Sequence, residues 1–397
     1  MRILVNTGPA YGLYNPLVPL AWALRSAGHE VLVAGPEPMA GMVNGSGLPF
    51  TPIYGPMHMR EFMLHDREGR PLVQASDEDA QLEQIGRGFG RLAGRVLDGL
   101  LRVTRQWRPD VVIAEPHAYA AAVAAEINGI PWIEHGIGMG YRAVCDEWGV
   151  DEFGPELSRY GFSGLPGPAA VLDNCPPTLR RDDAKPGIAM RYVAYDKPGT
   201  VPDWVMEPKR RPRLLLTLGT VEPEFVGVNR NIAGGLPLFQ DLLRTLPTLG
   251  LDIVVAAADS VVEQLRPLPE AVIAAGWLPL TAVLPACDLA VHHVGAGTTM
   301  ACLLAGLPEV LISRNAEQTD TARRLHTDGA AIQLVSEHLE TGAVLEACRA
   351  LLENPRHRER AQALRDEVAT LPSPAQLVPR IEQIVAEHAG SLAPALA

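Results

Sequence analysis

Residues 291–299 read VHHVGAGTT and hold the side chains best suited to bind a phosphate group. Glycines let a backbone approach a ligand closely, and a helix beginning after them offers unpaired N–H groups at its positive end. Threonine hydroxyls and an imidazole would add further hydrogen-bond donors. Together these groups would hold a pyrophosphate. A tight turn over a buried pair of histidines is the other interpretation of this pattern.

Three other segments offer groups that would complete a nucleotide-sugar site. Trp277 stands at a predicted strand end, where an indole can stack on a nucleobase. Glu317 and Gln318 follow another predicted strand and could hydrogen-bond to sugar hydroxyls. Thr220, after the apolar run 214–218, would add a hydroxyl donor to the phosphates. Each residue also has a structural interpretation, since Trp277 could lie in the core and Glu317 and Gln318 could be solvated surface residues. The order of the segments along the chain nevertheless favours a single binding site.

The elements that must position these residues alternate between strand and helix. Strands are predicted at 3–6, 30–33, 111–113, near 132, 214–218, 252–256, 272–274, 289–292 and 310–312. Helices are predicted at 16–27, 87–106, 118–128 and 355–389. Strands separated by helices imply parallel sheets covered on both faces, and ligands of such sheets bind beyond the carboxyl ends of the strands. We therefore expect two α/β halves, with a linker in the proline-rich stretch 145–210.

Bulk properties exclude several classes of protein. The formal net charge of −12 argues against general binding to nucleic acid or an anionic membrane, which requires clustered basic residues. Five cysteines without a C-x-x-C pair indicate neither a disulfide framework nor a zinc site. The N-terminus lacks the layout of a signal peptide, and no apolar run of bilayer length occurs. We expect a cytoplasmic protein.

Residues 270–330 resemble the donor-site signature of bacterial antibiotic glycosyltransferases, which have the GT-B fold of two Rossmann-like domains facing a central cleft. The matching residues are Gly276-Trp277-x-Pro279, Cys287-Asp288-Leu289, His292-His293-x-Gly295-Ala296-Gly297-Thr298-Thr299, Ala305-Gly306-x-Pro308, Glu317-Gln318 and Ala322-x-Arg324-Leu325. Segments near 16–31, 107–110 and 190–204 are similar to the branch that attaches deoxysugars to polyketides. The resemblance implies an acceptor-binding domain at 1–205, a nucleotide-sugar domain at 206–373, and a helix at 374–397 packing back on the first domain.

Carried over by position, the resemblance implies roles for the donor-side residues. The diphosphate would meet His292, Gly295, Gly297, Thr298 and Thr220, the base would stack on Trp277, and the sugar would contact Glu317 and Gln318. The usual loop is H-H-G-G-A-G-T-T, so Val294 replaces a glycine here. The usual sugar-binding pair is Asp-Gln, so Glu317 is longer by one methylene. The donor implied is a dTDP-sugar, with no cofactor and no metal.

The loop after the first strand lacks the expected base. In the family it reads G-H-x-x-P, and the histidine, oriented by an acidic residue, takes the proton from the acceptor hydroxyl. Here Leu13 stands at that position, and Glu115 occupies the place of the acid. Leucine cannot carry a proton. Glu115 is therefore predicted as a catalytic residue in the place of the acid, and the candidates for a relocated base lie in or near acceptor-side loops, namely His58, His65, Asp66, His117 and His135.

Two reactions remain open at this point. One is O-glycosylation with a relocated base. The other is C-glycosylation, in which a phenolic ring carbon attacks the anomeric centre and orientation does most of the work; several C-glycosyltransferases resemble this chain in lacking the histidine. We favour C-transfer slightly, with inversion in either case. The same motifs also admit a nucleotide-sugar 2-epimerase of this fold or a non-catalytic binding protein.

The acceptor is predicted to be a flat aromatic polyketide. Apolar, methionine-rich residues of the first half would line its pocket, namely Tyr11, Leu13, Met57, Met59, Phe62, Met63 and His135. Ordinary core packing is the alternative for the methionines. A homodimer and an auxiliary cytochrome-like protein, which some relatives require, are left open as partners.

Overall fold

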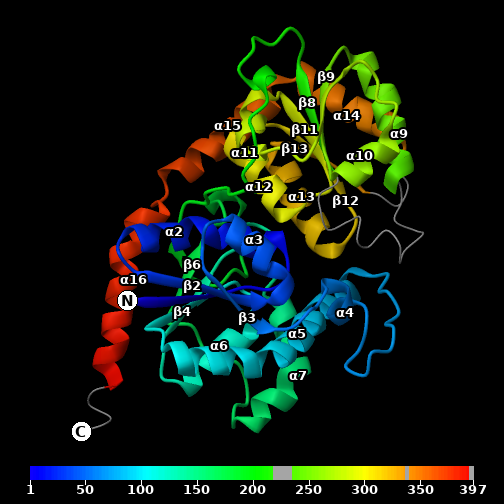
Figure 1. The fold of residues 1–397 in the computed structure, drawn as a ribbon. Helices are drawn as coiled ribbons and strands as arrows, with labels where there is room; N and C mark the ends of the chain where they lie inside the picture. The colour runs from blue at the N-terminus through cyan, green and yellow to red at the C-terminus, as the bar shows by residue number, and fades with distance from the viewer. Residues whose placement is uncertain (218–234, 336–338, 393–397) are drawn as a thin grey trace. The chain divides into compact units, whose positions relative to one another are not determined.

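The computed structural model describes residues 1–217, 235–335 and 339–392 (Figure 1). The chain divides into two compact units. Unit 1 consists of Met1–Cys175, Arg180–Tyr195 and Thr370–Ala397, and unit 2 of Pro176–Leu179 and Asp196–Ala369. The two units are described separately below.

Unit 1 contains a parallel sheet with the strand order β3-β2-β1-β4-β5-β6-β7. Its strands are β1 (Arg2–Asn6), β2 (Glu30–Pro36), β3 (Phe50–Tyr54), β4 (Val111–Ala114), β5 (Trp132–His135), β6 (Ala170–Asp173) and β7 (Ile188–Ala189). The strand order reverses between β1 and β4, and ligands of open parallel sheets bind beside such a reversal.

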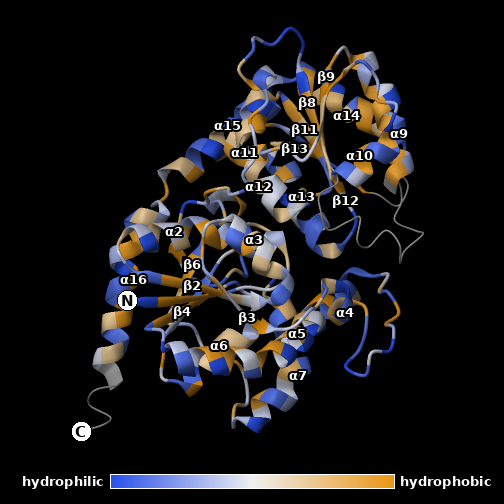
Figure 2. Ribbon diagram, viewed as in Figure 1, coloured by the Kyte–Doolittle hydropathy of each residue, from blue (hydrophilic) through white to orange (hydrophobic). Residues whose placement is uncertain are grey.

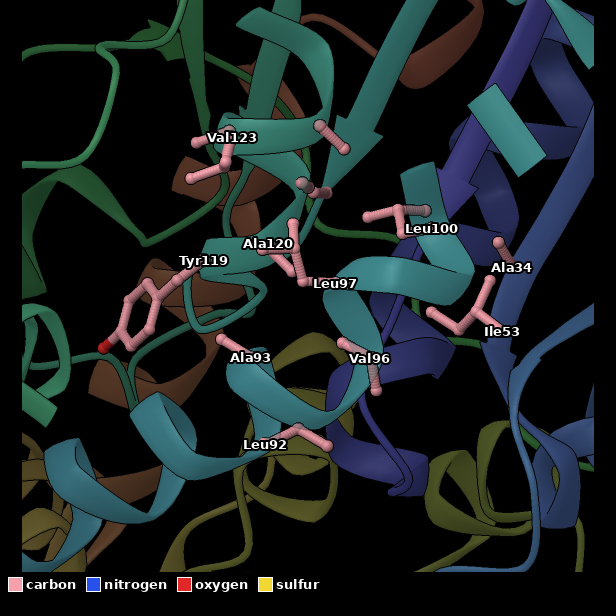
Figure 3. Close-up of a cluster of buried hydrophobic side chains, with 14 of the residues drawn as sticks. Ala34, Ile53, Leu92, Ala93, Val96, Leu97, Leu100, Tyr119, Ala120 and Val123 are labelled. Atoms are coloured by element: carbon pink, nitrogen blue, oxygen red, sulfur yellow. The ribbon is translucent and has the colours of Figure 1, made fainter. Parts of the chain in front are cut away.

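Helices cover both faces of this sheet because its strands alternate apolar side chains between the two faces. Leu4 and Val112 belong to one core with α5 (Glu78–Trp107), α6 (Tyr119–Ile127) and α7 (Val144–Arg159). Figure 3 shows part of this core, where Leu97 and Leu100 of α5 lie near α6. Ile3 and Val5 belong to the opposite core with α2 (Val18–Ser26) and α3 (Ala40–Gly45). Each large side chain so buried contributes about 1.5–3 kcal/mol of transfer free energy.

The last described helix, α16 (Pro374–Leu392), also belongs to the second core of unit 1. Its buried residues Leu377, Val378, Ile381 and Ile384 pack with α2 and the sheet. Nε2 of His29 also lies 3.0 Å from a carboxylate oxygen of Glu382. The chain therefore returns to unit 1 after completing unit 2.

The stretch 145–210, which we expected to be a linker, is only partly one. It begins with the 16-residue helix α7 and supplies the strands β6 and β7. The prediction was wrong because Pro155 lies inside α7 and many of its residues are charged, so the sequence showed no clear helical pattern there. Packing on α5 stabilises it, and a Cβ at Gly90 of α5 would lie 2.5 Å from the Gly149 carbonyl oxygen. Only glycine permits so close an approach.

Unit 2 contains a second parallel sheet, with the strand order β10-β9-β8-β11-β12-β13. Its strands are β8 (Arg213–Thr217), β9 (Asp252–Ala256), β10 (Val272–Gly276), β11 (Leu289–His292), β12 (Glu309–Ser313) and β13 (Ala331–Val335). The order reverses between β8 and β11. The loop 293–295 after β11 thus lies at the reversal.

Helices α9 (Gly235–Thr245) and α14 (Thr341–Glu353) pack on one face of this sheet, around Leu216, Val291 and Val310. In Figure 2 the sheet strands are mostly in hydrophobic colours, while outer helices such as α15 (Pro355–Thr370) mix polar and apolar residues. The predicted fold class, α/β with two parallel Rossmann-like sheets, is confirmed.

Candidate functional site

Helix α12 (Ala296–Ala305) begins directly after the loop that follows β11. Its N-cap, Gly295, provides no side-chain hydrogen bond, and the first helical bond runs from the Thr299 amide to the Gly295 carbonyl at 2.9 Å. The amides that precede Thr299 in this turn have no partner within the helix. Together with the helix dipole they form an electropositive end suited to a phosphate.

The glycines of this turn keep space at the helix end. A Cβ on Gly295 would lie 2.7 Å from His293 Nε2, so the imidazole of His293 packs where a side chain would stand. A Cβ on Gly297 would meet no atom within 4 Å, so this position borders open space. Thr298, in the same turn, is partly exposed.

His292 is fully buried, and the protein occupies both of its ring nitrogens. Nε2 lies 2.6 Å from Oε2 of Glu309, and the Val294 amide donates to Nδ1 at 3.2 Å. Because Nδ1 accepts a hydrogen bond, the ring proton is on Nε2 and is donated to Glu309. Burial lowers the pKa of His292 to about 3, so the ring is neutral. This geometry argues against the direct contact with a diphosphate that the sequence suggested for His292.

The neighbouring His293 is better placed for that contact. Its ring interacts with the Thr217 backbone, and its Nε2 lies against Gly295 at the start of α12. Burial lowers its pKa to about 3. A neutral imidazole beside a helix N-terminus can donate a hydrogen bond to a ligand bound there.

Val294 adopts the left-handed conformation, with φ of 61°, where the family loop has glycine. For a β-branched residue this region is a strong outlier that costs about 1–2 kcal/mol. The side chain is nevertheless buried, at 4% exposure. The replacement noted in the sequence therefore keeps the loop conformation of a glycine at an energetic cost.

A buried group of possible metal ligands lies under this loop. Among the described residues, one ligand atom each from His292, Cys302 and Glu309 lie within 4.8 Å of one another. Nε2 of His292 carries the ring proton, so it presents a hydrogen rather than a lone pair to the group. Burial also raises the pKa of Cys302 and of Glu309 well above their usual values, which favours their protonated forms. The arrangement fits a hydrogen-bonded cluster better than a metal site.

The other donor-side residues lie at strand ends or helix starts. Trp277 follows β10 and is 38% exposed, with the Lys197 ammonium 5.6 Å from its ring centroid, so it is not a core residue. Glu317 and Gln318 lie in the first turn of α13 (Ala316–Asp328) and are partly exposed. Oε1 of Gln318 accepts the Arg314 amide at 3.0 Å. Thr220 lies outside the described residues.

In unit 1, the loop after β1 meets the loop after β4 at the sheet reversal. The Gly8 amide donates to Oε1 of Glu115 at 3.2 Å, and the His117 amide donates to Oε2 at 2.7 Å. Leu13, in α1 (Tyr11–Tyr14), is 7% exposed, and a Cβ on Gly8 would lie 2.7 Å from Cδ1 of Leu13. An alkyl chain and a carboxyl group thus flank Gly8.

Glu115 is buried in a way that makes it a weak acid. Its exposure is 1%, and burial raises its pKa to about 8, although the amides of His117 and Gly8 act in the opposite direction. At neutral pH the carboxyl is mostly protonated, and slightly above it the carboxylate can accept a proton. A general base with a pKa near the working pH is efficient.

Two buried histidines accompany Glu115 at this sheet edge. His135, at the end of β5, donates from Nδ1 to the Gly136 carbonyl at 2.7 Å and has no partner on Nε2. The His117 ring stacks on Phe89 at a centroid distance of 4.0 Å, and its Nδ1 has no partner. Burial lowers the pKa of each ring to about 4, so both are neutral.

The remaining base candidates are used in local structure. Asp66 closes its own turn: Oδ1 accepts the amides of Glu68 and Arg70, and Oδ2 accepts Nε of Arg70 at 2.7 Å. Nδ1 of His65 lies 3.4 Å from the Arg60 carbonyl. His58 caps α4 (Met59–Met63), with its amide donating to Glu61 at 3.0 Å. These contacts favour structural roles over proton transfer.

Several predicted acceptor contacts are buried instead, since Leu13 belongs to the same core as Met57 and Phe62 and His135 is also fully buried. Met57 and Phe62 are fully buried in the core that includes α5, so in this structure they line no open surface. The methionine-rich pattern did not distinguish a pocket from a core, because the same residue types serve both. Tyr11, Met59 and Met63 are partly exposed, and the two methionines also pack against this core.

Sequence reasoning missed two sets of buried polar residues. One is Glu309, which is the first residue of β12, whereas we predicted that the strand begins at Val310. A single acidic residue at the edge of an apolar run could have indicated a buried acid. The other is a network in unit 1. Asp146 accepts the hydroxyls of Tyr119 and Tyr141, and Lys185 Nζ contacts Asp146 at 3.0 Å and Glu134 at 2.8 Å. Its members come from four separate segments, so no local pattern revealed it.

Among the described residues, none of the helices combines the length and the apolar character needed to cross a bilayer.

Comparisons with known proteins cover nearly the whole chain. Residues 22–219 match the family described as erythromycin biosynthesis protein CIII-like, N-terminal domain, and residues 240–384 match its C-terminal domain. The L-demethylnoviosyl transferase of Streptomyces niveus is 35% identical over 94% of this chain and 96% of its own length. The 10-deoxymethynolide desosaminyltransferase of Streptomyces venezuelae is 30% identical over 98% of both chains.

Solved structures show the same similarity. The glycosyltransferase SsfS6 of Streptomyces sp. SF2575, complexed with thymidine diphosphate, is 41% identical, with a TM-score of 0.85 over 96% of this chain and 99% of its own. The spinosyn rhamnosyltransferase SpnG, also complexed with thymidine diphosphate, is 26% identical, with a TM-score of 0.83 over 96% of this chain and 100% of its own.

Proposed function

Because this chain belongs to the erythromycin biosynthesis protein CIII-like family of nucleotide-sugar-dependent glycosyltransferases, we propose that it transfers a deoxysugar from a dTDP-sugar to an aromatic polyketide-type acceptor, with inversion and through a carbon–carbon bond. The observation that carries the carbon linkage is Leu13. This alkyl side chain stands beside Gly8 and Glu115, where the family's base would be.

The donor half of the proposal rests on the end of α12. The amides of its first turn and the His293 ring would hold the diphosphate and stabilise its charge as it leaves. His293 takes the role that we first gave to His292, because Nε2 of His292 is bonded to Glu309 whereas Nε2 of His293 lies against Gly295 at the start of α12. Trp277 would stack on the thymine base, and Glu317 with Gln318 would contact the sugar. The thymidine diphosphate bound to SsfS6 and SpnG supports the choice of nucleotide.

On the acceptor side, Glu115 would accept the phenolic proton. The resulting phenolate places electron density on the ortho carbon, which attacks the anomeric carbon. The bond between that carbon and the diphosphate oxygen breaks, and the oxygen keeps the electron pair. The proton on the attacking ring carbon then passes through solvent to the ring oxygen, which restores the aromatic phenol, and Glu115 releases its proton to solvent. Its pKa of about 8 suits Glu115 to this transfer.

The test is a reaction of the purified chain with a dTDP-deoxysugar and a panel of phenolic polycyclic acceptors. We expect a glycoside that survives mild acid and shows a carbon–carbon linkage by NMR. A sugar released by mild acid would support O-transfer with a relocated base. Conversion of the donor to its 2-epimer without acceptor would support the epimerase, and binding without turnover a non-catalytic protein.

The same reaction tests the two open partners. Turnover by the chain alone would argue against a required cytochrome-like auxiliary protein. Sedimentation of the active sample would decide between a monomer and a homodimer.

A further inference from the structure

Glu309 begins β12 and is 1% exposed. A buried carboxyl group is costly unless a hydrogen bond compensates for the lost water. Its Oε2 accepts Nε2–H of His292 at 2.6 Å, across the pair of strands β11 and β12. Nothing in the reaction proposed above uses this acid.

The hydrogen bond from His292 to Glu309 is the first of two in series. With its proton held on Nε2 by Glu309, the imidazole presents a lone pair at Nδ1, and this lone pair accepts the Val294 amide at 3.2 Å. Without an acceptor at Glu309, the His292 ring could rotate or change tautomer, and its Nδ1 would then no longer accept the Val294 amide. Glu309 therefore influences the conformation of the loop 293–295 through the His292 ring.

The amide so held belongs to the most strained residue of the loop. Val294 has φ of 61°, a conformation that β-branched residues seldom adopt. Strain of this kind persists only where the surroundings enforce it. The next residue, Gly295, is the N-cap of α12.

We propose that Glu309 is a positioning residue for the nucleotide-sugar loop: acting through His292, it holds the Val294 amide and thereby sets the start of α12 for the diphosphate. The role of the α12 start in binding the diphosphate rests on the proposed function. The link from Glu309 to the conformation of the loop 293–295 is independent of that function.

The test compares two substitutions of Glu309 in two loop backgrounds. Glu309→Gln keeps an acceptor oxygen for Nε2–H, whereas Glu309→Leu removes it at similar volume. Each is made in Val294→Ala, which keeps the strain of a left-handed residue, and in Val294→Gly, which relieves it. Both backgrounds remove the valine side chain, so they differ mainly in backbone preference.

We expect Glu309→Leu to weaken the binding of dTDP, measured by calorimetry, about tenfold in the Val294→Ala background and about threefold or less in Val294→Gly. The reason is that glycine occupies the left-handed region without a tether. Glu309→Gln should stay within about twofold of its parent in both. An equal loss in the two backgrounds, or a loss for Gln as large as for Leu, would overturn the proposal.

Hydrogen exchange of the Val294 amide gives a readout that needs no nucleotide. We expect Glu309→Leu to speed its exchange at least tenfold relative to core amides of β11. If the parent protein fails to bind dTDP, the proposed function is lost, yet this exchange still decides the link from Glu309 to the loop. Unchanged exchange would refute that link even in a protein that binds dTDP well.

A second pair of variants covers the case in which Glu309→Leu does not fold. The side chain of His292→Asn can accept the amide two residues on, as in an Asx-turn, without reaching Glu309. His292→Ala cannot. We expect the asparagine variant to bind dTDP at least threefold more tightly than the alanine variant; equal affinities would contradict the proposal.

Discussion

Each unit of the molecule buries a glutamate beside the loop to which we assign its chemistry, Glu115 in unit 1 and Glu309 in unit 2, and the two glutamates have different partners. In unit 2, Glu309 accepts a hydrogen bond from the imidazole of His292. In unit 1, Glu115 accepts only backbone amides among its described hydrogen bonds, from Gly8 and His117, and Leu13 stands nearby. The carboxyl–imidazole pair is thus present where the nucleotide sugar would bind and absent where the acceptor would lose its proton.

This difference separates two uses of a buried acid. An acid paired with a neutral imidazole can fix a tautomer and, through it, a loop. An acid held by amides alone, with its pKa near 8, is itself able to exchange a proton at physiological pH. The hydrogen-bond partners of each glutamate therefore suggest positioning in unit 2 and proton transfer in unit 1.

The largest effect should come from removing the proton-accepting acid. Glu115→Gln preserves the acceptor oxygen and the size of the side chain but cannot take a proton, so we expect kcat to fall about 10³-fold, within the range for a general base. Steady-state kinetics with a phenolic acceptor measures this. In the unmodified enzyme kcat/KM should rise with pH until about 8, the pKa of Glu115, and then level off. A profile that is flat from pH 6 to 9 would point to His135, whose pKa is about 4.

The free energy of unfolding should fall as the pH rises, whereas kcat/KM should rise, and both effects come from Glu115. The native state keeps the carboxyl proton up to about pH 8, whereas the unfolded chain releases it near 4.5. The native state therefore binds more protons between these values, and the free energy of unfolding falls as the pH rises through them. Denaturant titrations should show a smaller fall for Glu115→Gln, and an equal fall would place the pKa elsewhere.

Removing the imidazole of His293 in the donor loop should have the next largest effect. His293→Ala deletes one group proposed to stabilise the leaving diphosphate, and the loss of one such donor costs about 10²-fold in kcat. His292→Gln is a useful contrast, because that residue acts inside the protein. If His293→Ala leaves kcat unchanged while His292→Gln abolishes it, our assignment of the two histidines is reversed.

A smaller effect, on the product rather than the rate, is expected from Leu13→His. It would place an imidazole near Glu115 and give unit 1 the pairing that unit 2 already has. We expect a measurable share of acid-labile O-glycoside beside the C-glycoside, determined by chromatography before and after mild acid. Leu13→Gln, polar but unable to act as a base, is the control and should add no O-glycoside.

The smallest effect concerns the strained loop alone. Val294→Gly should be about 1 kcal/mol more stable than Val294→Ala, because both lose the side chain but only glycine adopts φ of 61° without cost. Urea denaturation of the two variants measures the difference. An equal or reversed order would show that the surroundings do not enforce the left-handed conformation.

Much of this arrangement could be predicted from the sequence, because it follows from local patterns. The apolar runs gave β1, β8 and β11, and the glycines with the hydroxyl residues after β11 indicated the helix start near 297. The replacement at 294 also marked the strained position. These features depend on residues adjacent in the chain.

The features that escaped prediction depend on residues far apart in the chain. His292 and His293 are neighbours, and only the presence of Glu309, 17 positions further on, shows that His292 is committed to the interior. The network around Asp146 includes a direct contact between residues 51 positions apart, Lys185 and Glu134. Helix α7 was hidden by Pro155 because its stability comes from packing on α5.

Because α16 packs on unit 1, the core of unit 1 cannot be completed until the whole of unit 2 has been synthesised. The sheet of unit 1 is encoded before residue 190, but the side chains of Leu377, Val378, Ile381 and Ile384 complete its core from the far end of the chain. A ribosome-bound fragment ending after β7 therefore exposes an apolar strip over α2 until all of unit 2 has been translated. Part of the core of unit 1 is therefore encoded only after unit 2, and deletion of α16 would remove that part.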